Sequence, residues 1–354
     1  MKTCYISYYP KKNYPRQVQF IRALKDCQFN CEMILNSQNG WKGYIEIIRL
    51  YNKARKTHSF DTIILGFRTT ELYYLIKLLS PGKKIIYDCF VPLYPAFRYE
   101  NKWHINSILR KILSPLVFIY EKYQLHYSST IICDTLSHIQ ILDQLYGVGK
   151  KTHAIYLGNP VEIDMNDNSM HLPSRNFTVF YYGTAQPLHG TALIVETAIQ
   201  LTAKYKNMEF ILVGTIPASY TEHIQNNDQI TYYKWKAYPE LMHLANNSKL
   251  CIGGPLGNTN QSQRVITGKT FQFMSMGKCT IIGINKETEY FNFVHRKNCL
   301  LVKQGIQSSL AKEIIWAFNN QNQLSEIGAA GKELFNQEFS DIQLKKKICD
   351  LIQY

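Results

Sequence analysis

Short apolar runs rich in Ile, Val and Tyr recur along the chain, separated by longer segments whose apolar residues repeat at helical spacing. This alternation is typical of parallel sheets built from βαβ units. In the first half the pattern predicts strands at 2–8, 31–35, 62–66, 84–88, 130–133 and 154–157. In the second half it predicts strands at 177–183, 208–214, 229–233, 250–253, 280–284 and 298–302.

The two halves are joined by a polar stretch, 158–176, which contains Pro160 and Pro173 and shows no periodicity. Such a stretch reads as a connection between domains. We therefore expect an α/β protein with two doubly wound, Rossmann-like domains, at 1–165 and 166–335. The remaining residues, 336–354, predict a C-terminal helix that can pack back on the first domain.

Composition narrows the choice of partners. The 354 residues are 45% hydrophobic, enough for two cores, and the formal net charge is +14. Residues 1–165 hold 22 Lys and Arg against 12 Asp and Glu, a net of +10, whereas the remainder holds 18 against 14, a net of +4. The surface should attract polyanions, phosphorylated ligands or an anionic bilayer. No helix-turn-helix, zinc-finger or RNA-binding motif is present, so nucleic acid is not an expected partner.

The densest aromatic and basic stretch of the first domain is 97–127, which mixes Trp103, Tyr123 and other aromatic residues with Arg110, Lys111 and other basic residues. On a helix this composition suits the headgroup region of an anionic membrane. The alternative is an ordinary long helix with one face on the sheet and the other in solvent. Pro115 interrupts the stretch and the pattern alone does not decide between the two.

Nine cysteines are scattered along the chain, and none forms a C-x-x-C pair. We expect them to be free thiols in a reducing cytosol. The first residues lack the apolar stretch of a signal peptide, and the longest strongly apolar run, 113–120, is too short to span a bilayer. These features predict a cytoplasmic protein, with attachment to the inner face of the cell membrane left open.

Candidate chemistry lies in the loops that follow strands, because ligands of doubly wound sheets bind beyond the carboxyl ends of the strands. Gly183 ends one strand and Gly190 precedes a helix, which would let backbone approach an anion at the helix N-terminus. Gly214 ends the next strand, and Gly254 lies in a third loop. Taken singly, each of these glycines also fits a plain turn.

A fourth segment, 264–278, predicts a short helix with Thr267 as its N-cap. Arg264 and Lys269 then lie just before and within its first turn, where cations cost stability unless an anion is bound. A diphosphate is the natural occupant, and Gln272, one turn further, can hydrogen-bond a ribose or sugar hydroxyl. The alternative is that both cations are merely solvated.

Several segments together resemble one family. They are YYGTAQPLHG at 181–190, FILVG at 210–214, WKAYPELMHLANNSKLCIGG at 235–254, RVITGKTFQFMSMGKCTII at 264–282, KKIIYDCFVPLY at 83–94 and YSSTIICDTLSHIQILDQLYGV at 127–148. In this order and spacing the chain resembles the GT-B glycosyltransferases, and among them the retaining family numbered four, over nearly its whole length.

The resemblance implies two Rossmann-like domains that face a cleft, with a nucleotide sugar bound by the second domain and the acceptor by the first. It implies retention, no obligatory metal and no further cofactor, with a UDP- or GDP-type donor. Together with the loops described above, it makes Gly183, Thr184, His189, Gly190, Gly214, Gly254 and Gln272 the candidates for donor binding, and Asp88, Arg264 and Lys269 the catalytic candidates.

The chain departs from that family at four of these positions. The usual pair of carboxylates falls on Arg264 and Gln272, and the usual basic pair falls on Thr184 and His189. One interpretation is compensation, with a cation lost near Thr184 and another gained at Arg264.

Asp88 ends a predicted strand and can bind an acceptor hydroxyl, although an Asp that caps the following turn has the same pattern.

We therefore expect a glycosyltransferase that moves a sugar from a nucleoside-diphosphate sugar to a hydroxyl of a lipid-linked or surface-polysaccharide acceptor. Two alternatives stay open. One is a nucleotide-sugar epimerase, and the other is a non-catalytic scaffold of the same fold that binds a nucleotide or an anionic membrane.

Overall fold

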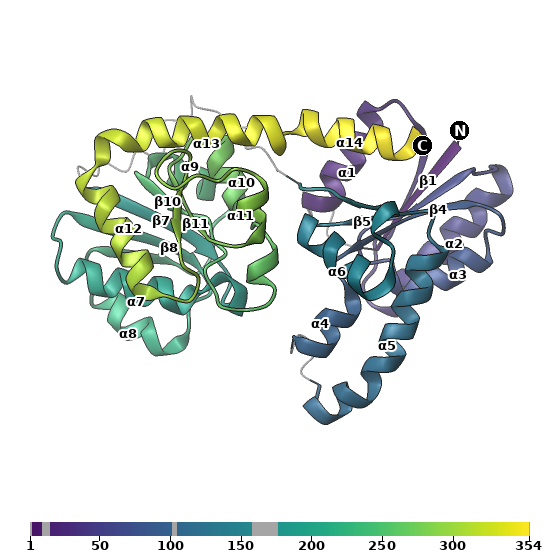
Figure 1. Ribbon diagram of the computed structural model, residues 1–354, viewed down its shortest axis with the longest axis horizontal. Helices are drawn as coiled ribbons and strands as arrows, with labels where there is room; N and C mark the ends of the chain where they lie inside the picture. The colour runs from purple at the N-terminus through teal and green to yellow at the C-terminus, as the bar shows by residue number, and fades with distance from the viewer. Residues whose placement is uncertain (1, 9–14, 101–104, 158–175, 354) are drawn as a thin grey trace. The chain divides into compact units, whose positions relative to one another are not determined.

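The computed structural model describes residues 2–8, 15–100, 105–157 and 176–353. The chain divides into two compact units (Figure 1). Unit 1 comprises Met1–Leu157 and Asp341–Tyr354, and unit 2 comprises Gly158–Ser340. The predicted junction at 165/166 and nearly all of the predicted connection lie in 158–175, outside the described residues.

Unit 1 is built on a six-stranded parallel sheet in the order β2-β1-β3-β4-β5-β6. The strands are β1 (Lys2–Ser7), β2 (Asn30–Leu35), β3 (Thr62–Leu65), β4 (Lys84–Phe90), β5 (Thr130–Cys133) and β6 (Thr152–Ala154). The helices are α1 (Pro15–Asp26), α2 (Trp41–Thr57), α3 (Tyr73–Leu78), α4 (Leu93–Tyr99), α5 (Ser107–Tyr127), α6 (Leu136–Tyr146) and α14 (Asp341–Gln353).

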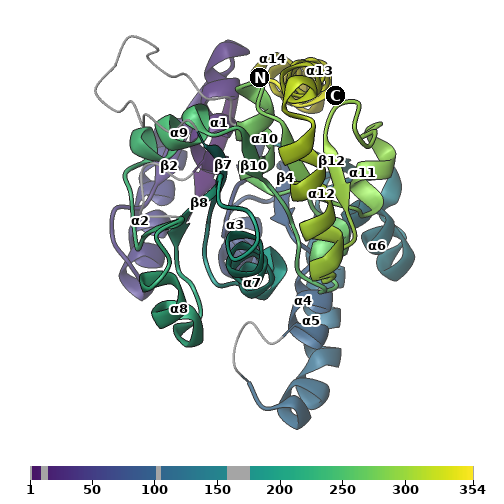
Figure 2. The same cartoon turned by 90° about the vertical axis from the view of Figure 1, so that its left-hand side faces the viewer.

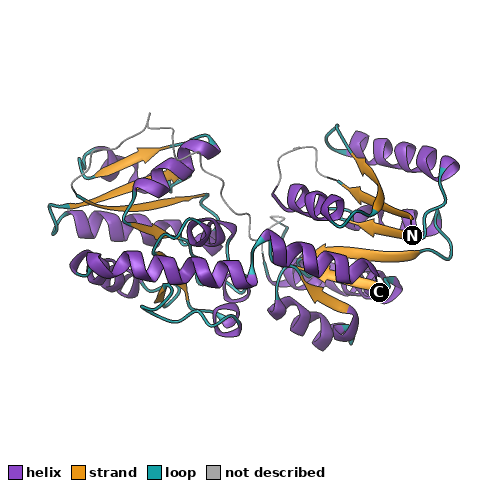
Figure 3. Ribbon diagram, turned by 90° about the horizontal axis from the view of Figure 1, so that it is seen from above, coloured by secondary structure: helices purple, strands orange, loops and turns teal. Residues whose placement is uncertain are grey.

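Helices cover both faces of this sheet, since successive strand residues point to opposite sides. Cys4 and Ile6 lie in a core with residues of α2, α3, α5 and α6, whereas Tyr5 lies in a second core with residues of α1 and α14. Figure 3 shows the resulting layers.

Unit 2 repeats the architecture with a parallel sheet in the order β12-β11-β10-β7-β8-β9. The strands are β7 (Phe177–Gly183), β8 (Met208–Gly214), β9 (Ile230–Tyr233), β10 (Leu250–Ile252), β11 (Thr280–Gly283) and β12 (Leu300–Val302). The helices are α7 (Thr191–Thr202), α8 (Thr221–Gln225), α9 (Tyr238–Asn247), α10 (Gly268–Ser275), α11 (Lys286–Tyr290), α12 (Gln307–Asn319) and α13 (Leu324–Glu338).

The two sheets confirm the predicted fold class of two doubly wound, Rossmann-like domains. One strand prediction was wrong in its position, because β6 pairs with β5 at Thr152–Ala154 instead of 154–157. The apolar Ile155 and Tyr156 that suggested the later position are buried just beyond the strand, and Ile155 packs in the core that contains α14. The apolar residues at 155–156 therefore reflect burial, in part against α14, and not a position in a strand.

The prediction of nine free thiols was also wrong. Cys27, directly after α1, forms a disulfide with Cys349 of α14, and the other seven cysteines are free. Leu344 and Ile348 of α14 pack beside Ala23 and Leu24 of α1, which brings the two sulfur atoms together. A bond between residues 322 positions apart leaves no sequence signature, because it depends on how two helices dock.

We predict that protein purified without reductant and then denatured will incorporate seven alkyl groups by mass spectrometry, and nine after reduction. The paired variant Cys27→Ser, Cys349→Ser should give seven in both conditions. Nine groups on the unreduced protein would contradict the disulfide.

Candidate functional site

A cavity of about 330 Å³ opens in unit 2 at the carboxyl ends of three neighbouring strands, β7, β8 and β9. We call it the unit 2 pocket. Its lining comprises Tyr182, Gly183, Thr184, His189, Val213, Gly214, Lys234, Trp235, Lys236, Leu241, Thr267, Gly268 and Lys269. Its size and its place at the strand ends are typical of ligand sites in doubly wound sheets.

Two glycines bring the strand ends close enough to form the floor of this pocket. A Cβ atom on Gly214 would lie 1.8 Å from the carbonyl oxygen of Gly183, and the φ of Gly214 is +118°. The same carbonyl accepts a hydrogen bond from the Thr215 N–H at 3.1 Å. Only glycine permits both this approach and this backbone conformation.

Two other predicted glycines support the site from behind and do not line the pocket. Gly190 has a φ of +65°, and a Cβ there would lie 2.8 Å from the backbone of Leu256. Gly254 accepts a hydrogen bond from the Thr270 hydroxyl through its carbonyl oxygen, at 3.1 Å. These contacts join the loops after β7 and β10 to each other and to α10.

The N-terminus of α10 faces the unit 2 pocket. Thr267 occupies the predicted N-cap position, but its hydroxyl donates to the Gly253 carbonyl at 2.7 Å and makes no cap bond. Gly268 is exposed, and the space where its side chain would be is open. Because the first N–H groups of a helix have no partner within it, this helix end can bind an anion.

Lys269 is the most unusual side chain of the site, because it is a cation with only 6% of its surface exposed. Its Nζ donates to the Tyr182 carbonyl at 2.9 Å and lies 4.3 Å from the centre of the Tyr181 ring. No carboxylate among the described residues forms an ion pair with it. Burial lowers the pKa of Lys269 to about 7. An anion in the pocket would stabilise the charged form.

His189 adds a neutral hydrogen-bonding group beside this amine. Burial, and secondarily the charge of Lys269, lower the pKa of His189 to about 3, so its ring is uncharged near neutral pH. The Nδ1 atom of the ring is buried and has no hydrogen-bond partner among the described residues. A buried polar atom without a partner is unfavourable, so the position of the His189 ring costs stability.

The loop after β9 contributes three residues that received no role from the sequence. Lys234, Trp235 and Lys236 line the pocket, and Trp235 is 75% exposed. Lys236 forms an ion pair with Glu240 at 2.8 Å, whereas most of the Trp235 side chain is exposed to solvent. Their place directly after a predicted strand was the signal that could have identified them.

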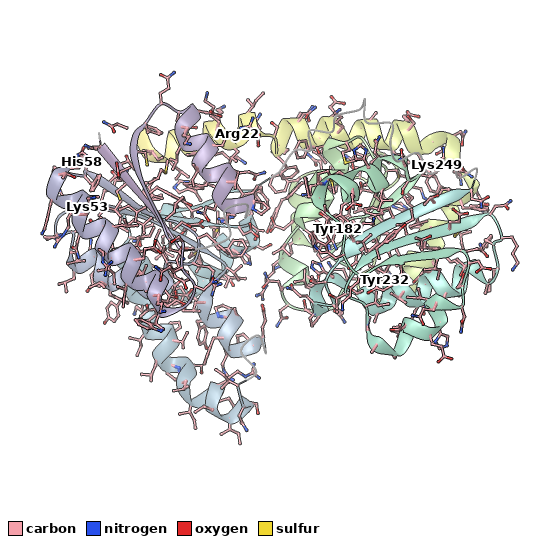
Figure 4. All side chains as sticks on the ribbon, turned by 180° about the vertical axis from the view of Figure 1, so that it is seen from behind. Arg22, Lys53, His58, Tyr182, Tyr232 and Lys249 are labelled. Carbon is pink, nitrogen blue, oxygen red and sulfur yellow. A yellow bond between two sulfur atoms is a disulfide. The ribbon has the colours of Figure 1, made fainter. Side chains whose placement is uncertain are left out.

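Besides Gly190 and Gly254, two further predicted residues of unit 2 lie outside the pocket lining. Arg264 ends a short 3₁₀ turn, Ser262–Arg264, that precedes α10, and is partly exposed. Gln272 is buried on α10, where its side-chain oxygen accepts a hydrogen bond from the Tyr182 hydroxyl. Figure 4 shows Tyr182 within unit 2. Gln272 thus orients Tyr182, which does line the pocket.

Asp88 lines a second cavity, of about 620 Å³, in unit 1. We call it the unit 1 pocket. Both carboxylate oxygens of Asp88 accept hydrogen bonds from Arg16, at 2.9 and 2.7 Å, and Arg16 also contacts Asp134 at 3.3 Å. The N–H of Phe90 donates to the same carboxylate. Asp88 therefore holds the end of β4 in place and has its charge balanced by Arg16.

No family model matches the sequence, and no curated protein matches it. Solved structures do match. The chain resembles HepE of Anabaena in complex with UDP-glucose, with a TM-score of 0.68 and 14% identity over 100% of this chain and 99% of that one. It also resembles sucrose-phosphate synthase of Thermosynechococcus elongatus, with a TM-score of 0.76 and 12% identity over 100% and 98% of the two chains.

A glycosyltransferase of Rickettsia africae matches with a TM-score of 0.63 and 14% identity over 99% of each chain. The structural neighbours are GT-B glycosyltransferases, and the chain has their fold. At such low identity the similarity establishes the fold alone.

We predict that Gly214→Ala will lower the stability of the protein by about 3 kcal/mol, because the added Cβ collides with the Gly183 carbonyl. Gly82→Ala is the matched control, since Gly82 also has a positive φ, +72°, but open space around its Cβ position. Denaturant unfolding should show a clearly larger loss for Gly214→Ala. Equal losses of stability in the two variants would contradict the close approach of Gly214 to the Gly183 carbonyl.

Proposed function

We propose that the protein is a glycosyltransferase that moves a sugar from a nucleoside-diphosphate sugar to a hydroxyl acceptor. The observation that carries the proposal is the buried Lys269, which forms no ion pair within the described part of the chain, at the open N-terminus of α10 in a pocket at the carboxyl ends of β7, β8 and β9. Such a site is preorganised for a diphosphate. The GT-B fold and the UDP-glucose bound by HepE support this choice.

Three groups would act on the diphosphate. The Lys269 amine and the first N–H groups of α10 supply positive charge, and the neutral His189 ring supplies a hydrogen bond. As the bond to the sugar breaks, negative charge develops on the leaving diphosphate, and these groups stabilise it without a change of position. Arg264 lies outside the pocket lining, so we assign it a smaller contribution.

The exposed ring of Trp235 at the rim of the pocket gives the nucleobase a surface for stacking. We assign a UDP-type donor on the basis of the ligands of HepE. We place the acceptor at unit 1, with a lipid-linked or surface-polysaccharide hydroxyl, and the reaction at the inner face of the cell membrane. Retention and independence of a metal are further parts of the proposal.

The test begins with thermal shifts in UDP, GDP, ADP, TDP and CMP, each with and without a chelator. A ligand that binds only the folded protein raises its melting temperature. We expect UDP to give the largest rise, unchanged by the chelator, and a labelled UDP-sugar to be transferred to lipid extracts. A rise in melting temperature without any sugar transfer would favour a non-catalytic scaffold. If the protein unfolds cooperatively and no nucleotide raises its melting temperature, the proposed donor site is wrong.

We predict that Lys269→Met will weaken UDP-glucose binding by at least about thirtyfold, because it removes a buried cation from the diphosphate. Met keeps the length of the side chain, so the fold should persist. Arg264→Ala should weaken binding less. Titration calorimetry measures both, and unchanged affinity in Lys269→Met would place the diphosphate elsewhere.

We predict that the affinity for UDP-glucose is highest below pH 7 and falls above it by up to about tenfold per pH unit. The reason is that burial lowers the pKa of free Lys269 to about 7, and a bound anion raises it in the complex. Binding then takes up a proton, which calorimetry in buffers of different ionisation enthalpy detects. The Lys269→Met variant should show neither the pH dependence nor the proton uptake; a wild-type affinity that rises with pH would contradict the prediction.

A further inference from the structure

One helix of unit 1 displays a continuous apolar stripe on its outer face. Large apolar side chains recur at intervals of three or four residues along α5, and each is 48 to 66% exposed. They are Ile108, Ile112, Leu116, Ile119, Tyr123 and Tyr127. At 3.6 residues per turn they fall within an arc of about 100° and extend over about 28 Å. We call this set the α5 stripe.

The α5 stripe is bordered by positive charge. Lys111 and Lys122 are exposed and, by helical geometry, lie along one side of it. The helix contains a single carboxylate, Glu121, which is buried and accepts hydrogen bonds from the backbone N–H groups of Leu93 and Tyr94 at the start of α4. The outer face of α5 is therefore apolar and basic, with no acidic side chain.

The opposite face of α5 is firmly attached to unit 1. The Tyr120 hydroxyl and the Gln124 amide both donate to the Thr70 carbonyl, each at 2.8 Å. Pro115 deprives the Lys111 carbonyl of its helical donor, and the Ser114 hydroxyl replaces that donor at 2.9 Å. The stripe is thus a fixed feature of the fold, and Figure 2 shows α5 extending past the sheet beside α4.

The α5 stripe reaches the mouth of the unit 1 pocket. Leu116 belongs to both, and Val117 and Tyr120 of the same helix line the pocket with Arg68 and Glu71. An amphiphilic molecule can therefore place its polar head in the pocket and keep its apolar part along the helix.

We propose that unit 1 docks on an anionic lipid bilayer through the α5 stripe. The helix lies in the plane of the interface, with the aliphatic side chains in the acyl region, Tyr123 and Tyr127 at headgroup level, and Lys111 and Lys122 on lipid phosphates. The docked protein would present the unit 1 pocket to an acceptor anchored in the same bilayer. This last step rests on the proposed glycosyltransferase function, but docking itself does not.

The charges favour a bilayer over a second copy of the chain. A symmetric pairing of two stripes would bring Lys111 and Lys122 of both copies into one interface without a carboxylate from either helix. Lipid phosphates supply the missing negative charge, and a net charge of +14 adds attraction at longer range.

The test is flotation with vesicles of phosphatidylcholine, with and without phosphatidylglycerol. We expect binding only to the anionic vesicles. The variant Ile108→Ser, Ile112→Ser, Ile119→Ser should weaken that binding by more than about tenfold, since three apolar side chains no longer enter the acyl region. Reversing Lys111 and Lys122 to Glu should weaken it by at least about fivefold for each lysine, and more at low than at high salt.

Matched controls separate the stripe from general surface effects. The variant Leu78→Ser, Ile342→Ser, Ile306→Ser removes three apolar side chains that are 77, 77 and 46% exposed outside the stripe. The variant Lys53→Glu, Lys249→Glu changes the net charge equally, at exposed lysines elsewhere (Figure 4). Both controls should retain vesicle binding. Equal losses in the controls and the stripe variants would overturn the proposal.

Two further outcomes keep docking and catalysis distinct. The stripe variants should retain the UDP-induced thermal shift of the wild type, because none of the substituted residues lines the unit 2 pocket. Stripe-dependent docking without any nucleotide shift would leave docking intact and remove the glycosyltransferase proposal. A nucleotide-induced thermal shift without vesicle binding would overturn bilayer docking and leave the glycosyltransferase proposal intact. A dimer that depends on the α5 stripe, detected by light scattering, would mean that the stripe binds a second copy of the chain and not a bilayer.

Discussion

The burial of Lys269 is the constraint on which the functional site depends. A lysine amine that is almost fully removed from water, with no carboxylate partner among the described residues, is costly to keep charged, and its lowered pKa expresses that cost. The structure offsets part of the cost through the Tyr182 carbonyl and the face of the Tyr181 ring. The remaining cost of the buried charge on Lys269 can be offset by an anionic ligand, because the amine lies in a pocket at the carboxyl ends of a parallel sheet.

The surrounding architecture holds this amine in place. Gly214 lets β8 approach β7, and the contact between Gly190 and the backbone of Leu256 joins two loops behind the pocket. The hydroxyls of Thr267 and Thr270 anchor α10 to the loop after β10 through the carbonyls of Gly253 and Gly254. Because backbone atoms make most of these contacts, the position of the helix end does not depend on the rotamer of any long side chain.

Unit 1 handles charge in the opposite way. Two carboxylates are buried in the described part of unit 1. Asp88 is matched by the guanidinium of Arg16, and Glu121 accepts hydrogen bonds from the backbone N–H groups of Leu93 and Tyr94. The excess of positive charge in this part of the chain appears instead on surfaces such as the outer face of α5, next to exposed apolar side chains. Unit 2 thus has a buried cation, Lys269, in its pocket, whereas the positive charge of unit 1 lies on exposed side chains such as Lys111 and Lys122 of α5.

The sequence by itself determined the order of the strands along the chain, the positions of glycines at the strand ends and the mixed apolar and basic character of α5. These are local properties, set by the period of apolar residues and by the conformations that glycine permits. The strands were correct apart from β6, where the burial of Ile155 by α14 displaced the apolar signal.

Only the tertiary structure decided which of those residues meet. Both Lys269 and Arg264 are cations at the predicted start of a helix, but the structure buries Lys269 and leaves Arg264 outside the pocket lining. It also turned Gln272 toward Tyr182, brought Lys234 and Trp235 to the pocket, and joined Cys27 to Cys349. The physical reason is common to all of them: burial, pairing and crosslinking depend on contacts between elements that are far apart in the chain.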